Sequence, residues 1–241
     1  MATLSVVVFS FPGMKQLTQC LESVLWADGV MVRHLADGGR IVSTEEVKRS
    51  SKSEEAGWVL HLWGEERVEA ELREELQALR MRAESSALLS YHVPIRSRLL
   101  GGWAEGSLWG PSPSVRLCRE AKALPPGWWE AAEKGAVVAP GLLRGWIGDY
   151  SLVELGAGVD WLNRLSNLWA AQAQAREQDL SPVNMVSGSL RVFLRLLWMN
   201  GFLSHGLAGL TLSTMAAYAK LLSGAKLWEA RTLKGKMKNE K

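Results

Sequence analysis

Four arginines near the middle of the chain have the chemistry to hold a phosphate group. A guanidinium group binds phosphate through two parallel hydrogen bonds, so these side chains are candidates for an anion site. The alternative is ordinary pairing with acidic neighbours at the surface. The sequence leaves both interpretations open for Arg96, Arg98, Arg116 and Arg119.

Carboxylates form the second group of candidates. Glu65 and Glu66 precede a stretch with helical periodicity, where their negative charge favours a helix N-terminus. Glu130 follows two tryptophans and is consistent with a solvated loop carboxylate. The four histidines show no metal-ligand spacing, and Cys20 and Cys118 form neither a disulfide framework nor a metal cluster. This cysteine usage is typical of a reduced, cytoplasmic setting.

Three apolar runs predict the strands that would position these residues. They span 4–9, 30–35 and 58–62, and apolar residues at helical spacing predict a helix at 14–25. The order strand, helix, strand is typical of an α/β fold whose parallel sheet has right-handed crossovers.

The predicted sheet also indicates where a ligand would bind. In open parallel sheets ligands lie beyond the carboxyl ends of the strands. We therefore expect the turns at 10–13, 37–39 and 63–66 to surround one crevice, with Asp37 in the second turn. Such a crevice suits a nucleotide, although the fold alone does not specify the chemistry.

The rest of the first part of the chain completes this layout. We expect a helix or loop at 43–56, a helix at 69–82, a strand at 88–93, a polar and glycine-rich excursion at 94–103, a return strand at 115–118, and helices from 160 onward.

The C-terminal part is the segment that bears on location. At 190–198 apolar residues face one way while Arg191 and Arg195 face the other, which predicts a basic amphipathic helix. Residues 198–219 carry no formal charge and are numerous enough to cross a bilayer, yet their glycines and polar groups count against a span. Helices lying on the membrane surface are the favoured interpretation; a spanning helix and an ordinary core pair are the alternatives.

Length and charge limit the remaining choices. A chain of 241 residues can bury a substantial core, and we expect an α/β domain at 1–185 with a helical extension at 186–241. The net charge of +3 is too small to argue for nucleic acid. The basic residues of the C-terminal tail are either solvated or in contact with anionic lipid.

Several segments, taken in order, resemble the family 2 glycosyltransferases that build the lipopolysaccharide inner core, in particular the heptose-region glucosyltransferase-like group. The resemblance covers nearly the whole chain. It rests on LSVVV at 4–8, CLESVLWAD at 20–28, VLHLWGEERV at 59–68 with LREEL at 72–76, YHVPIR at 91–96 with GGW at 101–103 and VRLCR at 115–119, and GFLSHGLAG at 201–209 with AKLWE at 225–229.

This resemblance implies a glycosyltransferase A-type fold at the cytoplasmic face of the inner membrane. It also implies sugar transfer from a nucleotide sugar to a lipid-linked acceptor, assisted by Mg²⁺ or Mn²⁺ held by an Asp-x-Asp motif. By the same resemblance Glu130 is the candidate base, and Glu65 is the remaining metal ligand. The residues that would contact the nucleotide or acceptor are Asp37, Glu65, Glu66, Arg96 and Arg116.

The departures from the family fall on its chemistry. Trp63 and Glu65 stand where the two aspartates should be, and an indole cannot ligate a hard cation. Trp129 stands where a histidine is expected before Glu130. Two functions therefore stay open, an active hexosyltransferase or a catalytically inactive scaffold that binds a membrane partner. We expect weak metal-dependent binding of nucleotide sugars, and we expect replacement of Trp63 and Glu65 by aspartate to strengthen it.

Overall fold

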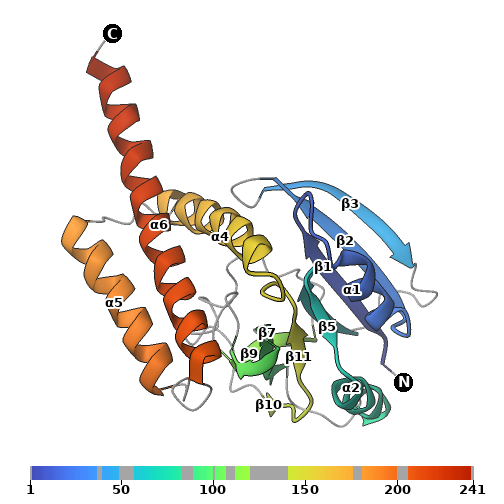
Figure 1. The fold of residues 1–241 in the computed structure, drawn as a ribbon. Coiled ribbons are helices and arrows are strands. Elements are labelled where there is room, and N and C mark those ends of the chain that lie inside the picture. The colour runs from blue at the N-terminus through green and yellow to red at the C-terminus, as the bar shows by residue number, and fades with distance from the viewer. Residues whose placement is uncertain are drawn as a thin grey trace. The chain divides into compact units, whose positions relative to one another are not determined.

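The computed structural model describes residues 2–36, 40–48, 57–82, 89–99, 101–106, 112–119, 141–175, 181–199 and 206–239. The chain divides into two compact units, which are described separately (Figure 1). The first comprises Met1–Ala36 and Arg40–Val153, and the second includes Glu154–Lys241.

The first unit is built on a mixed seven-stranded sheet with the strand order β10-β6-β9-β4-β1-β2-β3. At its centre β1 (Leu4–Ser10) pairs in parallel with both β2 (Gly29–Leu35) and β4 (Trp58–Trp63). These strands are the three predicted apolar runs, and their placement as parallel neighbours is confirmed. The nearly continuous hydrophobic character of β1 and β4 follows from burial on both faces, as is usual for parallel strands, whereas Arg33 and His34 of β2 are half-buried.

Two helices pack against this sheet. The first, α1 (Leu17–Val24), buries Cys20 and Val24, and α2 (Ala70–Arg82) buries Leu72 and Leu76. All four side chains belong to the main hydrophobic core together with the central strands. The expected α/β class is therefore confirmed, although α1 begins three residues later than the predicted helix at 14–25.

One edge of the sheet differs from the prediction. The expected helix or loop at 43–56 is wrong for its first part, because Ile41–Lys48 forms the strand β3, antiparallel to β2. Every residue of β3 is exposed, so its sequence lacks the alternation that identifies a strand. Lys48 fixes the end of β3 by donating hydrogen bonds to the carbonyls of Leu25 and Ala27, at 2.8 and 2.6 Å.

The other edge follows the predicted order. The strand β6 (Ser90–Val93) and the return strand β9 (Ser114–Cys118) pair antiparallel, and β9 also pairs with β4. The short strand β10 (Gly141–Leu142) lies parallel to β6 at the outer edge. The antiparallel position of β9 beside β4 brings Arg116 next to the end of β4.

A second sheet of four strands, in the order β5-β11-β7-β8, replaces the expected polar excursion. Its strands are β5 (Glu66–Val68), β11 (Ile147–Asp149), β7 (Ile95–Leu99) and β8 (Gly102–Glu105). Along β7 buried residues alternate with half-buried arginines. This sheet therefore has one face in the core and one face toward solvent.

The second unit is helical and consists of α4 (Leu155–Ala175), α5 (Pro182–Met199) and α6 (Gly206–Asn239). The long helix α6 packs against both α4 and α5. Lys226 of α6 reaches the carbonyl of Asn163 and the hydroxyl of Ser166 on α4, at 2.9 and 2.8 Å. The unit starts upstream of residue 186, because α4 belongs to it. None of the helices among the described residues has both the length and the hydropathy needed to cross a bilayer.

Candidate functional site

The resemblance places a metal site at the turn after β4. At the position of the first expected metal ligand this turn has Trp63. The Trp63 side chain is fully buried. Its ring stacks on Phe11 with centroids 6.1 Å apart and an interplanar angle of 6°, and lies 5.4 Å from the ring of Phe9. Aromatic packing thus occupies the carboxyl ends of β1 and β4 at this position.

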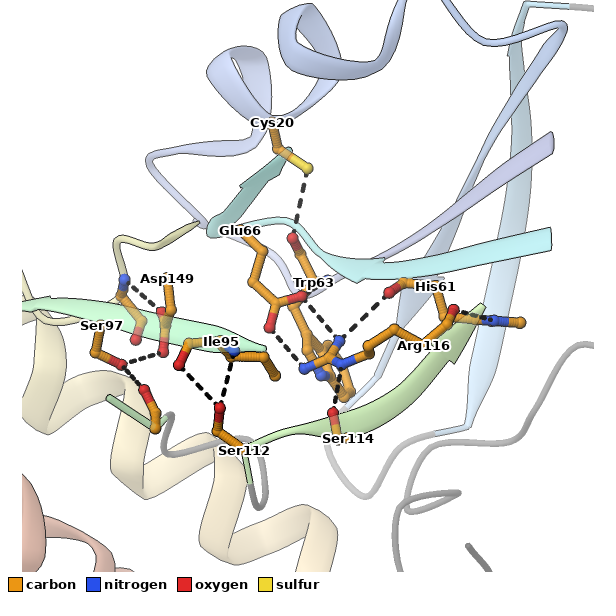
Figure 2. A network of polar contacts seen from close by, with 12 residues as sticks. Cys20, His61, Trp63, Glu66, Ile95, Ser97, Ser112, Ser114, Arg116 and Asp149 are labelled. Carbon is orange, nitrogen blue, oxygen red and sulfur yellow. Dashed lines mark hydrogen bonds and ion pairs between the residues drawn. The ribbon is translucent and has the colours of Figure 1, made fainter. Parts of the chain in front are cut away.

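Glu66 and Arg116 form a buried ion pair immediately beyond this turn (Figure 2). The two guanidinium nitrogens Nη1 and Nη2 donate to Glu66 Oε2 and Oε1 at 2.8 and 2.7 Å. The backbone N–H of Trp63 donates to the same Oε2 at 2.9 Å, and Arg116 Nε donates to the Ser114 hydroxyl at 3.2 Å. Both carboxylate oxygens are therefore committed to groups within the fold.

A second buried carboxylate lies beside this pair. In the β5–β11 ladder Asp149 is directly opposite Glu66, and both side chains are fully buried. Asp149 accepts a hydrogen bond from the backbone N–H of Ser151 at 2.9 Å. The Ser97 hydroxyl lies 2.9 Å from Asp149 Oδ2 and 2.8 Å from the carbonyl of Gly106, and its single hydrogen can be donated to one of them at a time.

The electrostatics of this cluster are those of a desolvated site. Burial, reinforced by the nearby charge of Asp149, raises the pKa of Glu66 to about 7, although Arg116 and the Trp63 N–H oppose the shift. Burial and the same guanidinium lower the pKa of His61 to about 4. At neutral pH His61 is consequently an uncharged residue, with Nδ1 3.4 Å from the Arg116 carbonyl.

Cys20 lies on the other side of the turn but offers no nucleophile. Burial, followed by the charge of Glu66, raises the pKa of its thiol well above the ordinary range. Its Sγ–H donates to the carbonyl of Trp63 at 3.4 Å. A thiol needs a lowered pKa to react, so this cysteine is structural.

The sequence-predicted site residues end in different places. Glu66 and Arg116 are brought together as described, and Glu65 lies half-buried in the adjoining turn. Arg96 lies on the opposite face of the four-stranded sheet from Ser97, because the two alternate along β7. Asp37 and Glu130 lie outside the described residues.

Two further observations concern the predicted ligands. Arg119 stacks over the Trp58 ring at 5.7 Å. Among the described residues no group of three or more histidine, cysteine, aspartate or glutamate side chains has the arrangement of a metal site. Glu65 is thus the half-buried carboxylate that stands where the resemblance expects a ligand.

The sequence interpretation missed Asp149 and Ser97. Asp149 is the only charged residue in the segment 146–152, which is otherwise largely apolar, and a carboxylate in such a segment is a signal of a buried, partnered group. Ser97 gives no comparable signal, because serine is common on both faces of a strand. No protein-family model matches the chain, and no curated protein matches it. What bears on function is therefore the geometry of these residues.

Proposed function

We propose that this chain is a catalytically silent, glycosyltransferase-like protein that lies on the cytoplasmic face of a bacterial inner membrane and acts there as a binding module. The main support for this proposal is that the side chains of the turn after β4 are engaged within the fold. Trp63 is buried between aromatic rings, and both oxygens of Glu66 are held by Arg116 and a backbone N–H.

The turn after β4 lacks the metal ligands that transfer from a nucleotide sugar commonly requires. A divalent ion that bridges a diphosphate takes several oxygen ligands, of which the protein commonly supplies at least one or two carboxylates. The Trp63 side chain offers no oxygen, and a cation on Glu66 would have to displace Arg116 from a desolvated pair. With Glu65 alone, most of the coordination sphere of a divalent ion would be water. This weak coordination supports a protein that does not catalyse sugar transfer.

The membrane component of the proposal is supported by the surface of α5. Its exposed apolar side chains recur at intervals of three or four residues and so form one stripe along the helix. Val183 and Trp198, near its two ends, are 74% and 77% exposed. The members of this apolar stripe are Val183, Val186, Leu190, Leu194 and Trp198.

Charge beside the stripe favours a lipid surface as its partner. Arg191 and Arg195 are exposed, and each directly follows a leucine of the stripe. A helix with this pattern lies in the membrane interface, with the apolar residues in the acyl boundary and the arginines near lipid phosphate. The packed helix α6 carries its own exposed apolar residues, among them Leu207 at 70% and Trp228 at 56%.

The second candidate function is sugar transfer from a nucleotide sugar to a lipid-linked acceptor. One observation favours it: Glu65 is half-buried and lies in the turn that follows the central strand β4, where the resemblance places a metal ligand. In this alternative Glu65 is the metal ligand, and the remaining partners come from the acceptor, the diphosphate and water.

Calorimetry separates the two functions. We expect titration of the full chain with UDP-glucose or ADP-glucose in the presence of Mn²⁺ to give no saturable, metal-dependent heat. The Glu65→Gln variant serves as the matched control, because the silent function predicts the same trace for both proteins. Metal-dependent binding by the natural chain that Glu65→Gln removes would overturn the silent function and establish the second candidate.

Sedimentation with vesicles tests the membrane component. We expect the chain to sediment with vesicles of phosphatidylethanolamine and phosphatidylglycerol, and the triple change of Leu190, Leu194 and Trp198 to glutamine to abolish this. Leu142→Gln is the control, since this residue is 64% exposed but belongs to the first unit. Sedimentation that the triple change leaves intact would contradict the proposed role of α5.

A further inference from the structure

The solvent side of the four-stranded sheet carries arginines and aromatic rings side by side. We call this surface the aromatic–arginine face, and its members are Arg67, Arg96, Arg98, Trp103, Trp146 and Tyr150. All of them are half-buried, so each presents part of its side chain to solvent. None of them takes part in the Glu66–Arg116 pair.

The strand register explains why these residues share one face. Gly148 of β11 is the partner of Arg67 on β5 and of Arg96 on β7, and Arg98 is the partner of Trp103 on β8. Residues two positions apart on a strand project to the same side. Trp146 and Tyr150, which flank Gly148 at that spacing, therefore join the arginines.

Gly148 forms the floor of this face. A methyl group added to it would lie 2.5 Å from Glu69 Oε1, 2.8 Å from Tyr150 Cε2 and 3.4 Å from Trp103 Cη2. The absence of a side chain lets the two rings and the Glu69 carboxylate, which accepts a hydrogen bond from the Tyr150 hydroxyl at 3.0 Å, lie over the backbone of β11. The rings are consequently held in place by the sheet.

Each arginine of the face stacks on a ring. The guanidinium carbon of Arg67 lies 3.9 Å from the Tyr150 centroid, that of Arg96 lies 4.9 Å from Trp146, and that of Arg98 lies 5.2 Å from Trp103. Trp103 in turn meets Trp146 and Tyr150 edge to face, at 4.8 and 5.5 Å. The result is a continuous series of contacts across the strands.

Stacking orients a guanidinium without using its hydrogen-bond donors. A cation–π contact uses the charge of the guanidinium and none of its five N–H groups, so these donors remain available for a ligand. Arg96 has a distant carboxylate partner, Glu105, at 3.9 Å. For Arg98 no carboxylate of the described residues lies within ion-pair distance. These two arginines are therefore positioned to donate hydrogen bonds to a bound anion.

Spacing adds a further match to phosphate. Arg96 and Arg98 are two residues apart on one strand and face the same side, which places their Cα atoms about 7 Å apart. A single phosphate group between two such side chains can accept hydrogen bonds from both. Beside it, the partly exposed surfaces of Trp103 and Trp146 present C–H and π surface of the kind on which sugar rings lie.

We propose that the aromatic–arginine face binds a phosphorylated saccharide, with the phosphate held by Arg96 and Arg98 and the sugar ring against Trp103 and Trp146. This inference rests on the proposed binding function and names its ligand class. A single-stranded nucleic acid fits less well, because it needs a positively charged groove that follows several successive phosphates, whereas this face offers one closely spaced pair of arginines, Arg96 and Arg98.

Indole N–H spectroscopy on the full chain tests this site directly. The probe is glucose 6-phosphate, with glucose and inorganic phosphate as separate arms, and the readout is the set of tryptophan side-chain signals in a ¹⁵N–¹H spectrum. We expect glucose 6-phosphate to shift the Trp103 and Trp146 signals in a saturable manner at millimolar concentration. Phosphate alone should act more weakly at these signals, and glucose weakest of all.

Variants assign the response to the arginines. Arg98→Gln should weaken binding about tenfold or more, as expected for losing a charge-assisted hydrogen-bond donor pair. Arg96→Gln is the second variant, should the first fail to fold. The matched control is Arg73→Gln, because Arg73 also stacks on a tryptophan, Trp26, at 5.6 Å, but lies outside this face. The Arg73→Gln variant should bind glucose 6-phosphate as tightly as the natural chain does.

Several outcomes would overturn the inference. They are unchanged affinity in both Arg96→Gln and Arg98→Gln, equal shifts with glucose and glucose 6-phosphate, no saturable shift at tens of millimolar, and tighter binding of a single-stranded oligonucleotide at the same signals. Vesicle sedimentation through α5 does not involve these residues. Loss of the glucose 6-phosphate response with sedimentation intact would therefore refute the ligand and leave the membrane component standing.

Discussion

Glu66 and Arg116 are 50 residues apart in sequence and meet through two hydrogen bonds of 2.7 and 2.8 Å in the core. Neither side chain is more than 2% exposed. A carboxylate at this position could in principle bind a metal ion. In this fold both oxygens of Glu66 instead accept hydrogen bonds from Arg116, and this pairing holds β9 against the turn after β4. A pair of this kind costs desolvation to form, and its loss on one side leaves the other charge buried.

The pair should therefore respond very differently to single and double substitution. In Glu66→Gln the new amide nitrogen faces a donor of Arg116 in either orientation, and in the Oε2 position it faces the Trp63 N–H as well. We expect the free energy of unfolding to fall by about 3–5 kcal/mol. In Glu66→Leu with Arg116→Met the loss should be smaller, about 1–3 kcal/mol for the unsatisfied Trp63 N–H. Urea titration measures both, and equal losses would show that the pair carries no special energy.

The buried carboxylate and the buried imidazole should give opposite pH dependences. The pKa of Glu66 is raised from 4.5 to about 7, so its contribution to stability is present below pH 4.5 and is lost as the pH rises through 7. The pKa of His61 is lowered from 6.5 to about 4, so its contribution is present above pH 6.5 and is lost as the pH falls through 4.

In the natural chain these two contributions oppose each other between pH 4.5 and 6.5. We expect His61→Phe to reveal the Glu66 dependence, as a fall in unfolding free energy of about 3 kcal/mol between pH 4.5 and 7.5. Glu66→Gln should reveal the reverse slope from His61. Chemical denaturation at half-unit pH steps measures both, and parallel profiles for the two variants would contradict the assignment.

The structure also changes the expected effect of restoring aspartate at 63. From the sequence, the double change Trp63→Asp with Glu65→Asp is expected to strengthen metal binding. Because the Trp63 ring is fully buried and stacked on Phe11, the change instead places a carboxylate in an aromatic core. We now expect Trp63→Asp to lower the free energy of unfolding by about 4 kcal/mol or more without creating metal affinity.

Thermal melts with and without Mn²⁺ test this expectation. Trp63→Phe is the matched control, since it keeps an apolar ring and should cost less stability. A stable Trp63→Asp protein whose melting temperature rises with Mn²⁺ would show that the turn rearranges to expose position 63. The aromatic cluster would then be a replaceable cover over a metal site.

The sequence predicted those parts of the fold in which burial leaves a pattern. The central strands β1 and β4 are nearly continuous apolar runs because both faces are covered, and β2 keeps this pattern at Val30, Val32 and Leu35 although Arg33 and His34 are half-buried. In contrast, β3 is exposed along its whole length and is held by pairing with β2, a property of its neighbour that its own residues do not record. The hairpin of β7 and β8 was not predicted, because the arginines of β7 made this segment resemble a polar loop.

The candidate site shows the same division. That Glu65 and Glu66 follow β4 was readable from the apolar run before them. That Glu66 turns inward could not be predicted, because it depends on the antiparallel register that places Arg116 of β9 near the end of β4. Register between distant strands is fixed by the packing of the whole sheet, so the partner of a single carboxylate is not a local property.

The last prediction concerns how α5 would attach to lipid. Arg191 and Arg195 lie beside the apolar stripe, so binding should have an electrostatic part of about 1 kcal/mol for each arginine. We expect the double change Arg191→Gln with Arg195→Gln to weaken sedimentation with anionic vesicles by about tenfold or more and to reduce its salt dependence. Arg164→Gln on α4 is the control for charge alone. If the double change alters binding to neutral and anionic vesicles equally, the arginines act through the structure of the helix, and the attraction to lipid phosphate is refuted while the apolar stripe still accounts for attachment.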